Sequence, residues 1–505
     1  MKKGKVYIVG AGPGDIGLIT VKGLDCIKRA DVIVYDNLIN PQLLESAHPD
    51  AELIYAGKSF EGHAKEQHEI NQLLIDKANE GNTIVRLKGA DPFVLGRGGE
   101  EAEALAENRI EFEIVPGISS AIAGPAYAGI PVTHRGIASS FAVVTGHEDP
   151  SKEETSINWE KLATGVDTLV FLMGMNNLPH IVDKLIECGR SPETSVALIR
   201  HGTTPQQKTL TGTLDTIVEM SQQADFKPPV VIIIGEVVKL RDKLAWFENR
   251  PLFGKRVLVT RARAQASALS KLLIERGAEP IELPTIEIHD APETNELDRA
   301  ILELPEYDWI IFTSANGVIA FWRRIRALNL DSRWLHYVNL GAIGPATADA
   351  LEYQGIHPDF IPKEYTSDGI LVEFARKNIN GQKILLPRAD IAPKDLVEGL
   401  TALGALPYEV TAYTTRQPPE LISQVREKIA ERNVDVITFT SSSTVTNFLN
   451  SLGNNRNILN RATIACIGPL TASTAREAGL NVNIVAQEQT IPGLVEAIED
   501  FYKKL

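Results

Sequence analysis

Cysteine is scarce in this chain of 505 residues, which contains only Cys26, Cys188 and Cys466. Three widely separated cysteines provide neither a disulfide framework nor a CxxC metal knuckle. The ten histidines include no HExxH pair or similar ligand spacing. We therefore expect a protein without disulfides and without a bound metal.

Long hydrophobic runs are also missing. The longest apolar stretches, such as residues 230–238, are much shorter than the about 20 residues that span a bilayer. The apolar residues 6–9 lead directly into glycines, so they do not form a signal-peptide core. Basic residues are outnumbered by acidic ones, and the net charge of −14 argues against broad binding to nucleic acid or anionic membranes. We expect a cytoplasmic protein with neither of these partners.

The pattern that is present is typical of an α/β protein with several domains, because 505 residues exceed one ordinary core. Short β-branched runs alternate with longer amphipathic stretches. The first half predicts strands at Lys5–Val9, Asp31–Tyr35, Thr83–Leu87, Ala142–Thr145, Thr168–Met173, Val196–Arg200 and Val230–Ile234, and helices at Ala64–Glu80 and Gly99–Asn108. A polar segment with proline and glycine at residues 248–254 is the predicted linker, and a new strand pattern begins at Lys255.

The second half contains an internal repeat. Residues 309–318 (WIIFTSANGV) are similar to residues 436–445 (VITFTSSSTV), and residues 341–347 are similar to residues 465–471. Two copies predict two similar α/β lobes, since a solenoid needs at least three stacked repeats. Two lobes that face each other form a cleft, which is a common place for a ligand.

Residues 86–101 (RLKGADPFVLGRGGEE) are the most informative segment of the chain. They follow a predicted buried strand and combine four glycines with Asp91, Arg97 and two glutamates. A structural turn needs fewer glycines, so this loop indicates a backbone that comes close to a ligand whose charge the side chains recognise.

A second glycine motif follows the first predicted strand. Residues 12–17 satisfy the spacing GxGxxG, and Asp36 ends the next strand, as in a dinucleotide site. An NAD-dependent oxidoreductase is therefore the alternative interpretation. Two residues argue against it, because Pro13 removes a backbone donor and Asp15 places a negative charge where a pyrophosphate would bind. A ligand with an adenosine and a cationic centre suits this loop better.

Several motifs of the first half occur together in order: residues 10–15 (GAGPGD), 35–39 (YDNLI), 89–101, 115–120 (VPGISS), 129–135 (GIPVTHR), 168–175 (TLVFLMGM), 201–208 (HGTTPQQK) and 235–238 (GEVV). Over residues 1–247 the chain resembles the uroporphyrinogen-III C-methyltransferases of the tetrapyrrole (class III) methylase family. The resemblance implies a two-lobed α/β methylase fold with lobes at about 1–115 and 116–247. It also implies S-adenosylmethionine as cosubstrate and a homodimer formed through this half.

The same resemblance assigns residues to the site. S-adenosylmethionine is expected to contact Pro13, Gly89, Ala90, Asp91, Val94, Ser119, Ser120, Met173 and Gly202. Asp36 is implied as the general base and Lys58 as the proton donor, although taken alone they look like a turn cap and a surface charge. The family commonly has Gly-Gly-Asp where this chain has Gly89-Ala90-Asp91, so Ala90 restricts the backbone there.

The implied substrate, uroporphyrinogen III, carries many carboxylates, so an acidic protein needs a local basic rim. Guanidinium groups bind carboxylates in a bidentate manner. We therefore expect Arg97 and Arg135 to bind substrate, with Arg86, Lys88 and Arg200 as further candidates for this rim. Ordinary surface ion pairs are the alternative for some of these residues.

The second half shows a more divergent set of motifs: residues 257–261 (VLVTR), 312–318 (FTSANGV), 341–345 (GAIGP), 386–390 (LPRAD), 408–414 and 467–471 (IGPLT). Over residues 255–505 the chain resembles the uroporphyrinogen-III synthases. The resemblance implies a two-lobed α/β fold, with lobe one at 255–288 plus 414–505 and lobe two at 289–413. The crossings between the lobes are expected at 283–288 and 409–415.

The synthase resemblance implies ring closure of hydroxymethylbilane with inversion of the last pyrrole, without a cofactor. Tyr413 is the candidate that helps the hydroxyl leave, and inter-lobe packing is its alternative role. The candidates for substrate binding are Arg261, Arg388, Ser441, Ser442 and Thr471. For the hydroxyl residues helix capping is an equally good interpretation. The chain is then a bifunctional enzyme that forms precorrin-2, a precursor of sirohaem or cobalamin, with a tetrapyrrole-binding module as the alternative for the second half.

Overall fold

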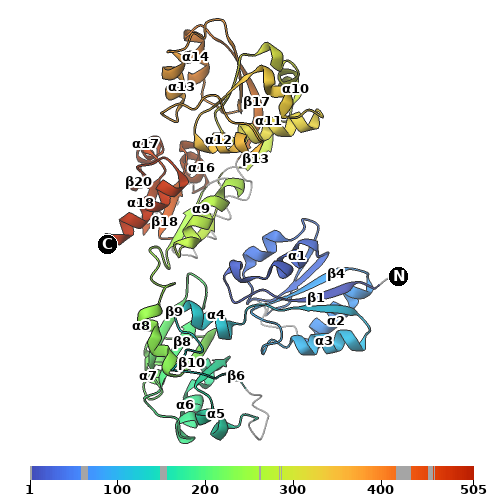
Figure 1. Ribbon diagram of the computed structural model, residues 1–505, viewed down its shortest axis with the longest axis vertical. Coiled ribbons are helices and arrows are strands. Elements are labelled where there is room, and N and C mark those ends of the chain that lie inside the picture. The colour runs from blue at the N-terminus through green and yellow to red at the C-terminus, as the bar shows by residue number, and fades with distance from the viewer. Residues whose placement is uncertain are drawn as a thin grey trace. The chain divides into compact units, whose positions relative to one another are not determined.

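The computed structural model describes residues 3–57, 66–147, 156–260, 263–283, 285, 287–416, 434–452, 459 and 461–504, with the side chains of 263–267 left aside. The chain forms two compact units (Figure 1). Unit 1 comprises Met1–Lys255 with Glu275–Glu279, and unit 2 comprises Arg256–Ile274 with Pro280–Leu505. Each unit contains two five-stranded sheets flanked by helices. In the part of the chain described, no helix is long and apolar enough to cross a membrane.

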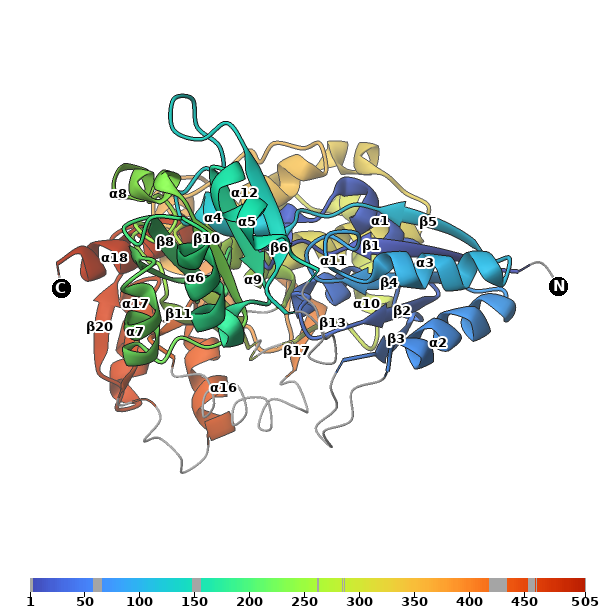
Figure 2. The same ribbon diagram turned by 90° about the horizontal axis from the view of Figure 1, so that it is seen from below.

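The first sheet of unit 1 is entirely parallel and has the order β3-β2-β4-β1-β5. Its strands are β1 (Lys5–Gly10), β2 (Val32–Tyr35), β3 (Glu52–Tyr55), β4 (Thr83–Lys88) and β5 (Glu111–Val115). Helix α1 (Val21–Arg29) packs on one face, where its Cys26 and Ile27 are buried. Helices α2 (Gln67–Asn79) and α3 (Gly98–Glu107) lie side by side on the other face (Figure 2). Burial on both faces explains the nearly continuous apolar runs of the inner strands β1, β2 and β4.

The second sheet of unit 1 has the order β6-β7-β10-β8-β9 and is mixed. Its strands are β6 (Phe141–Thr145), β7 (Thr168–Leu172), β8 (Ser195–Arg200), β9 (Lys208–Thr213) and β10 (Val230–Ile234). Its helices are α4 (Ser120–Tyr127), α5 (Trp159–Gly165), α6 (Leu178–Glu187), α7 (Ile217–Gln223) and α8 (Arg241–Leu244). Strand β10 is central and antiparallel to both neighbours, and all of its residues are buried. The strands predicted for the first half are therefore confirmed, with ends that differ by one residue at most.

Unit 2 contains two lobes, each with one sheet. Lobe one has the order β12-β11-β18-β19-β20, and lobe two has the order β13-β17-β16-β14-β15. The strands are β11 (Arg256–Val259), β12 (Glu279–Glu282), β13 (Glu287–Asp290), β14 (Trp309–Phe312), β15 (Asn339–Ala342), β16 (Lys383–Ala389), β17 (Leu406–Arg416), β18 (Val436–Phe439), β19 (Thr463–Cys466) and β20 (Val482–Val485). The helices are α9 (Arg263–Glu275), α10 (Asn295–Leu302), α11 (Ala315–Ala327), α12 (Pro345–Tyr353), α13 (Ser367–Phe374), α14 (Asp395–Ala402), α16 (Ser442–Leu452), α17 (Pro469–Glu477) and α18 (Ile491–Lys503).

The internal repeat of the sequence is a structural repeat. Helices α13 and α18 begin with the same cap, because Thr366 accepts from the amide of Gly369 at 3.0 Å and Thr490 accepts from that of Gly493 at 3.1 Å. The two lobes differ in where the chain enters them. Lobe one starts at β11 and is completed only by β18, β19 and β20, whereas lobe two is one continuous segment from β13 to β17. Residues 409–415, expected as a crossing, lie within β17.

Candidate functional site

The carboxyl ends of parallel strands β1, β4 and β5 bring three loops of unit 1 together. The loops after β1 and β4 pair through their backbones. The amide of Gly12 donates to the carbonyl of Ala90 at 3.2 Å, and the amide of Ala90 donates to Gly12 at 2.8 Å. Pro13 and Gly89–Asp91, which the sequence predicts as cofactor contacts, therefore lie in neighbouring loops.

Glycine is required where these loops touch. A Cβ atom on Gly117, after β5, would lie 2.2 Å from the carbonyl oxygen of Ala90. A Cβ atom on Gly10 would lie 2.7 Å from the same oxygen. Real Cβ atoms do not approach backbone this closely, so both positions must lack a side chain. We call Gly10, Gly12, Ala90 and Gly117 the backbone cradle.

Ala90 has a φ of +56°, in the left-handed region. An L-residue with a side chain is strained there by about 1 kcal/mol. The position where this chain departs from Gly-Gly-Asp is thus one that favours glycine. The departure affects the cradle itself, because both backbone hydrogen bonds to Gly12 are made by Ala90.

The carboxylate of Asp91 organises the cradle. Its Oδ1 accepts from the amides of Phe93 at 2.8 Å and Val94 at 3.1 Å, and its Oδ2 accepts from the amide of Gly117 at 3.0 Å. The first two bonds fold the loop after β4 on itself, and the third ties it to the loop after β5. Asp91 and Val94, both predicted cofactor contacts, therefore shape the loop through the backbone.

Asp15 joins the loop after β1 to the elements of the second sheet. Its amide donates to Thr203 Oγ1 at 3.1 Å, and its Oδ2 accepts from the hydroxyl of Tyr127 at 2.8 Å. Burial, followed by the hydrogen bond to Asp15, raises the pKa of Tyr127, so its hydroxyl keeps the proton that it donates. A Cβ atom on Gly14 would come within 2.6 Å of Thr204. Pro13 and Gly202 therefore belong to loops in direct contact.

The remaining predicted residues of unit 1 are distributed as follows. Ser119 caps α4 by accepting from the amide of Ala121 at 3.3 Å, and Ser120 is the first residue of that helix. Met173 directly follows β7, with a φ of +60° and an exposed side chain. Arg135 is exposed in a turn. Lys58 lies outside the described residues.

Arg97 is exposed and forms a bidentate ion pair with Glu100, at 2.9 and 2.7 Å. The hydrogen bonds to Glu100 raise the pKa of Arg97 and lower that of Glu100. An exposed pair contributes little to stability, so a substrate carboxylate can replace Glu100 at small cost.

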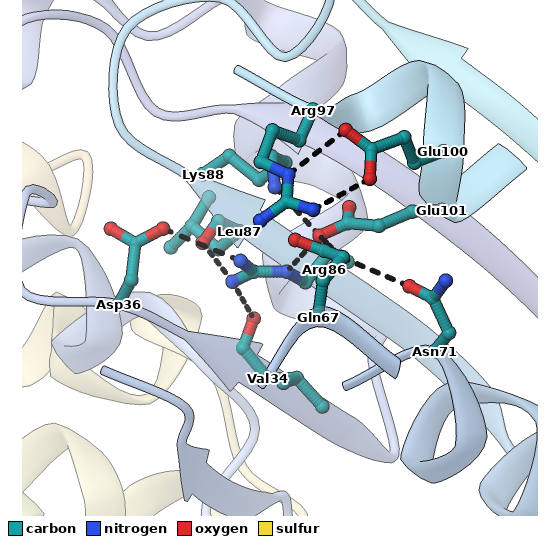
Figure 3. Close-up of polar contacts among 10 residues, drawn as sticks. All are labelled: Val34, Asp36, Gln67, Asn71, Arg86, Leu87, Lys88, Arg97, Glu100 and Glu101. Carbon is teal, nitrogen blue, oxygen red and sulfur yellow. Dashed lines mark hydrogen bonds and ion pairs between the residues drawn. The ribbon is translucent and has the colours of Figure 1, made fainter. Parts of the chain in front are cut away.

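The prediction that Arg86 and Lys88 belong to an exposed basic rim is wrong, because both side chains are buried under α3. They form a four-charge cluster with Glu101 of α3 and with Asp36, which follows β2 (Figure 3). Glu101 is fully buried, and its Oε1 accepts from Arg86 Nε at 3.1 Å and from Lys88 Nζ at 2.6 Å. Burial, followed by the charge of Arg86, lowers the pKa of Lys88. Arg200, the other rim candidate, is half-buried, and its Nε is fully enclosed.

The sequence contains a signal for this cluster that the rim interpretation missed. Arg86 and Lys88 are two residues apart in a strand, so their side chains point to the same face. The remaining residues of β4 after Thr83 are Ile84, Val85 and Leu87, which are apolar and buried. Two cations on one face of a buried strand need buried acceptors, and Glu101 supplies them from the covering helix.

The loop after β1 does not have the structure of a dinucleotide site. It leads into a three-residue 3-10 turn, Ile16–Leu18, which Asp15 caps by accepting from the amide of Gly17 at 2.8 Å. The next helix, α1, begins only at Val21. A dinucleotide pyrophosphate binds at the amino terminus of a helix that starts directly at the glycine loop, so the geometry disfavours NAD.

In unit 2, Tyr413 lies on β17 in lobe two and is 8% exposed. Its hydroxyl is 3.0 Å from Ser314 Oγ, and Ser314 caps α11 by accepting from the amide of Gly317 at 3.0 Å. Burial raises the pKa of Tyr413, while the hydrogen bond with Ser314 opposes that shift. Tyr413 therefore carries its proton and is held by the start of a helix.

Arg388, predicted as a basic anchor for substrate, is buried at 4% exposure. It donates to the carbonyl of Pro393 at 2.8 Å and to Glu409 Oε1 at 3.2 Å, and Lys394 also pairs with Glu409. Its Nε is buried without a partner among the described residues. Arg261 lies outside the described residues.

The hydroxyl residues of lobe one stand at helix starts. Ser441 Oγ accepts from the amide of Thr444 at 3.3 Å, as a helix cap does. Ser442 Oγ accepts from Thr474 Oγ1 at 2.8 Å, which links α16 to α17. Thr471 is buried in the first turn of α17. Since α16 follows β18 and α17 follows β19, these residues share one edge of the sheet.

Comparison with known proteins agrees with the division of the chain into two units. Residues 5–218 match the family model of tetrapyrrole (corrin/porphyrin) methylases, and residues 267–496 match that of uroporphyrinogen-III synthase HemD. A porphyrin biosynthesis protein HemD of Ruminiclostridium josui is 38% identical over 99% of this chain and 98% of its own length.

Two uroporphyrinogen-III C-methyltransferases are also similar. The protein of Bacillus subtilis is 44% identical over 71% of this chain and 74% of its own length. The protein of Priestia megaterium is 55% identical over 46% of this chain and 98% of its own length. The chain therefore belongs to the tetrapyrrole methylase family in its first half and to the uroporphyrinogen-III synthase family in its second half.

Proposed function

We propose that the chain catalyses two consecutive steps of tetrapyrrole biosynthesis. Unit 2, a uroporphyrinogen-III synthase, closes the ring of hydroxymethylbilane and inverts the last pyrrole. Unit 1, a uroporphyrinogen-III C-methyltransferase, transfers two methyl groups to that product and forms precorrin-2. The main support is that two family matches cover separate parts of one chain, and that one relative spans both parts.

The backbone cradle fits S-adenosylmethionine as cosubstrate, which would supply an electrophilic methyl group. Side chains are excluded at Gly10 and Gly117 because the backbones of the loops touch there, so the loops can present main-chain groups to a ligand together. The loop contains the negative charge of Asp15 and leads into a short 3-10 turn instead of a long helix. These features suit a sulfonium cation better than a phosphate. Contacts are expected at Pro13, Gly89, Ala90, Asp91, Val94, Ser119, Ser120, Met173 and Gly202.

Methylation of a pyrrole carbon requires that a proton leaves the macrocycle. In this proposal Asp36 removes that proton, since it directly follows β2 beside β4 and is partly exposed. Lys58 acts as the proton donor. Arg97 and Arg135, both exposed, bind carboxylates of the substrate.

In the synthase half the bilane must lose hydroxide before the ring closes. Tyr413 keeps its proton because burial raises its pKa, and in this proposal it donates that proton to the leaving hydroxyl. Ser441, Ser442, Thr471, Arg261 and Arg388 are proposed to hold carboxylates and amides of the bilane. The half is expected to need no cofactor.

One incubation tests both halves. The protein receives hydroxymethylbilane and S-adenosylmethionine, and the product is identified by mass and isomer. Isomer III with two added methyl groups is expected. Omission of S-adenosylmethionine should leave unmethylated isomer III, and supplying uroporphyrinogen III directly should bypass unit 2. Spontaneous isomer I without added methyl groups would contradict both activities.

The role of Asp36 is tested by Asp36→Asn. We expect turnover to fall by about 100-fold or more, the usual contribution of a general base. The affinity for S-adenosylmethionine, measured by calorimetry, should stay within about twofold, because Asp36 is outside the backbone cradle. Full turnover in this variant would remove the base assignment and leave the methyltransferase assignment intact.

Assembly and location are further parts of the proposal. The methylase half is expected to form a homodimer in the cytoplasm. Light scattering on the full-length protein would give twice the mass of one chain, and a single-chain mass would contradict the dimer.

A further inference from the structure

Arg86 connects the most buried charge of unit 1 with the proposed base. Its guanidinium lies between Glu101, which is fully buried, and Asp36, whose side chain is 21% exposed (Figure 3). We propose that Arg86 is a positioning residue for methyl transfer, which fixes the carboxylate of Asp36 at the carboxyl edge of the sheet. This inference rests on the proposed role of Asp36 as the base.

The guanidinium is fixed independently of Asp36. Its Nε donates to Glu101 Oε1 at 3.1 Å, and its Nη1 donates to the carbonyls of Val34 at 3.4 Å and Leu87 at 3.2 Å. Because the group is planar, holding Nε and Nη1 also determines where Nη2 points. It points toward Asp36 Oδ2, at 3.5 Å.

Asp36 is then held from two sides. The amide of Leu38 donates to Oδ1 at 3.0 Å, and Arg86 is beside Oδ2. The χ2 torsion of an aspartate is broad when nothing restrains it. Without Arg86, the carboxylate of Asp36 could therefore rotate and move Oδ2 from its present position. A base must lie within hydrogen-bond reach of its proton, and a misplacement of about 1 Å can cost about 100-fold in rate.

The cluster is poorly built as a purely structural ion pair. Glu101 Oε1 accepts from Arg86, Lys88 and Gln67, whereas Oε2 is buried without a partner among the described residues. Two cations and a buried carboxylate cost desolvation energy that an apolar core would avoid. A group kept at such a cost is expected to serve the site next to it.

The experiment is a double-mutant cycle on the full-length protein with Arg86→Lys, Asp36→Asn and both together. Arg86→Lys keeps a cation beside Glu101 but loses the planar fork. We expect kcat for methyl transfer at saturating S-adenosylmethionine to fall by about 10-fold to 100-fold, with cosubstrate affinity within about twofold. In the Asp36→Asn background the further loss should be below about twofold, because the carboxylate to be positioned is gone.

Arg190→Lys is the matched control. Arg190 also donates to carbonyls, those of Ala163, Val166 and Asp167, but it lies in the loop between α6 and β8 and has no contact with the cluster among the bonds described. The kcat of the Arg190→Lys variant should equal that of the unmodified protein. If Arg86→Lys fails to fold, Arg86→Gln with Glu101→Gln carries the same cycle. That variant removes one charge of each sign, so the net charge of the cluster is unchanged.

The outcomes separate the two claims. Unchanged kcat in Arg86→Lys, together with a large loss in Asp36→Asn, overturns the positioning role alone. An equal loss in both backgrounds overturns it as well, since Arg86 would then act without Asp36. Full activity in Asp36→Asn removes the base assignment and this inference with it. A loss that depends on Asp36 supports both.

Discussion

The two units place polar groups at the carboxyl edges of their sheets, but they use different chemistry there. Unit 1 relies on close backbone contacts at Gly10 and Gly117 and on buried charges such as Glu101. Unit 2 relies on hydroxyl groups at helix starts, as at Ser314 and Ser441. A glycine contact or a buried ion pair tolerates almost no substitution, whereas many residues can cap a helix. This difference explains why the first half carries the clearer sequence signature.

The largest effect is expected where the cradle is tightest. Gly117→Ala would place a methyl group 2.2 Å from the carbonyl of Ala90. We expect binding of S-adenosylmethionine to be undetectable by calorimetry and unit 1 to lose about 1 to 3 kcal/mol of stability, as overpacking does. Gly99→Ala is the control, since nothing lies within 4 Å of its Cβ position in α3. Normal binding in Gly117→Ala would show that the cradle is not the cosubstrate site.

The hydroxyl chemistry of unit 2 is tested by Tyr413→Phe. Loss of a proton donor should lower the rate of ring closure by about 100-fold, and the isomer III fraction should fall as spontaneous closure takes over. Tyr307→Phe is the matched control, because Tyr307 is buried in the same core of lobe two and its pKa is also raised by burial. An unchanged rate and isomer ratio in Tyr413→Phe would leave this tyrosine a packing role only.

A smaller effect is expected at the contact between Asp15 and Tyr127. Tyr127→Phe removes one hydrogen bond to a carboxylate, which is worth about 1.5 kcal/mol. The affinity for S-adenosylmethionine should weaken by about tenfold, while kcat at saturation stays the same. Thr203→Val, which removes the acceptor for the amide of Asp15, should act in the same direction. Unchanged affinity in both variants would mean that this contact does not shape the site.

The smallest effect is expected at Ala90. Ala90→Gly relieves the left-handed strain of about 1 to 2 kcal/mol but adds freedom to the unfolded chain, so we expect a gain of about 0.5 to 1 kcal/mol. The melting temperature of unit 1 should rise by a few degrees, and cosubstrate affinity should not weaken. A lower melting temperature would show that the methyl group of Ala90 packs favourably.

Most strands of the first half could be predicted, because they read as short apolar runs. Strands β3, β5 and β9 were missed, since they contain more polar and exposed residues. The spacing of Arg86 and Lys88 shows that they share one face of a strand. It does not show that α3 covers that face and brings Glu101 to them. The contact of Asp15 with Tyr127, which joins residues 112 positions apart, could not be predicted either. No local pattern encodes a contact between a loop and the end of helix α4 that only the packing of the two sheets brings together.

In unit 2 the repeat was visible in the sequence, but the burial of Arg388 was not. Its motif, residues 386–390, does not indicate which group covers the arginine. Burial follows from Glu409, which stands on the neighbouring strand β17 and receives the guanidinium. Helix capping by Ser441 could be expected from residue type, whereas the link between Ser442 and Thr474 depends on how α16 packs on α17.

The way in which the chain enters lobe one has a consequence during synthesis on the ribosome. Strand β11 pairs with β18, and the amide of Arg256 donates to Asp435, 179 residues later. At about 5 to 20 residues per second, β11 waits on the order of ten to thirty seconds for its partner, while lobe two emerges and can fold. The edge of β11 stays exposed during that interval. Vectorial synthesis therefore leaves lobe one, and not lobe two, as the part of the nascent protein that needs protection from wrong pairing.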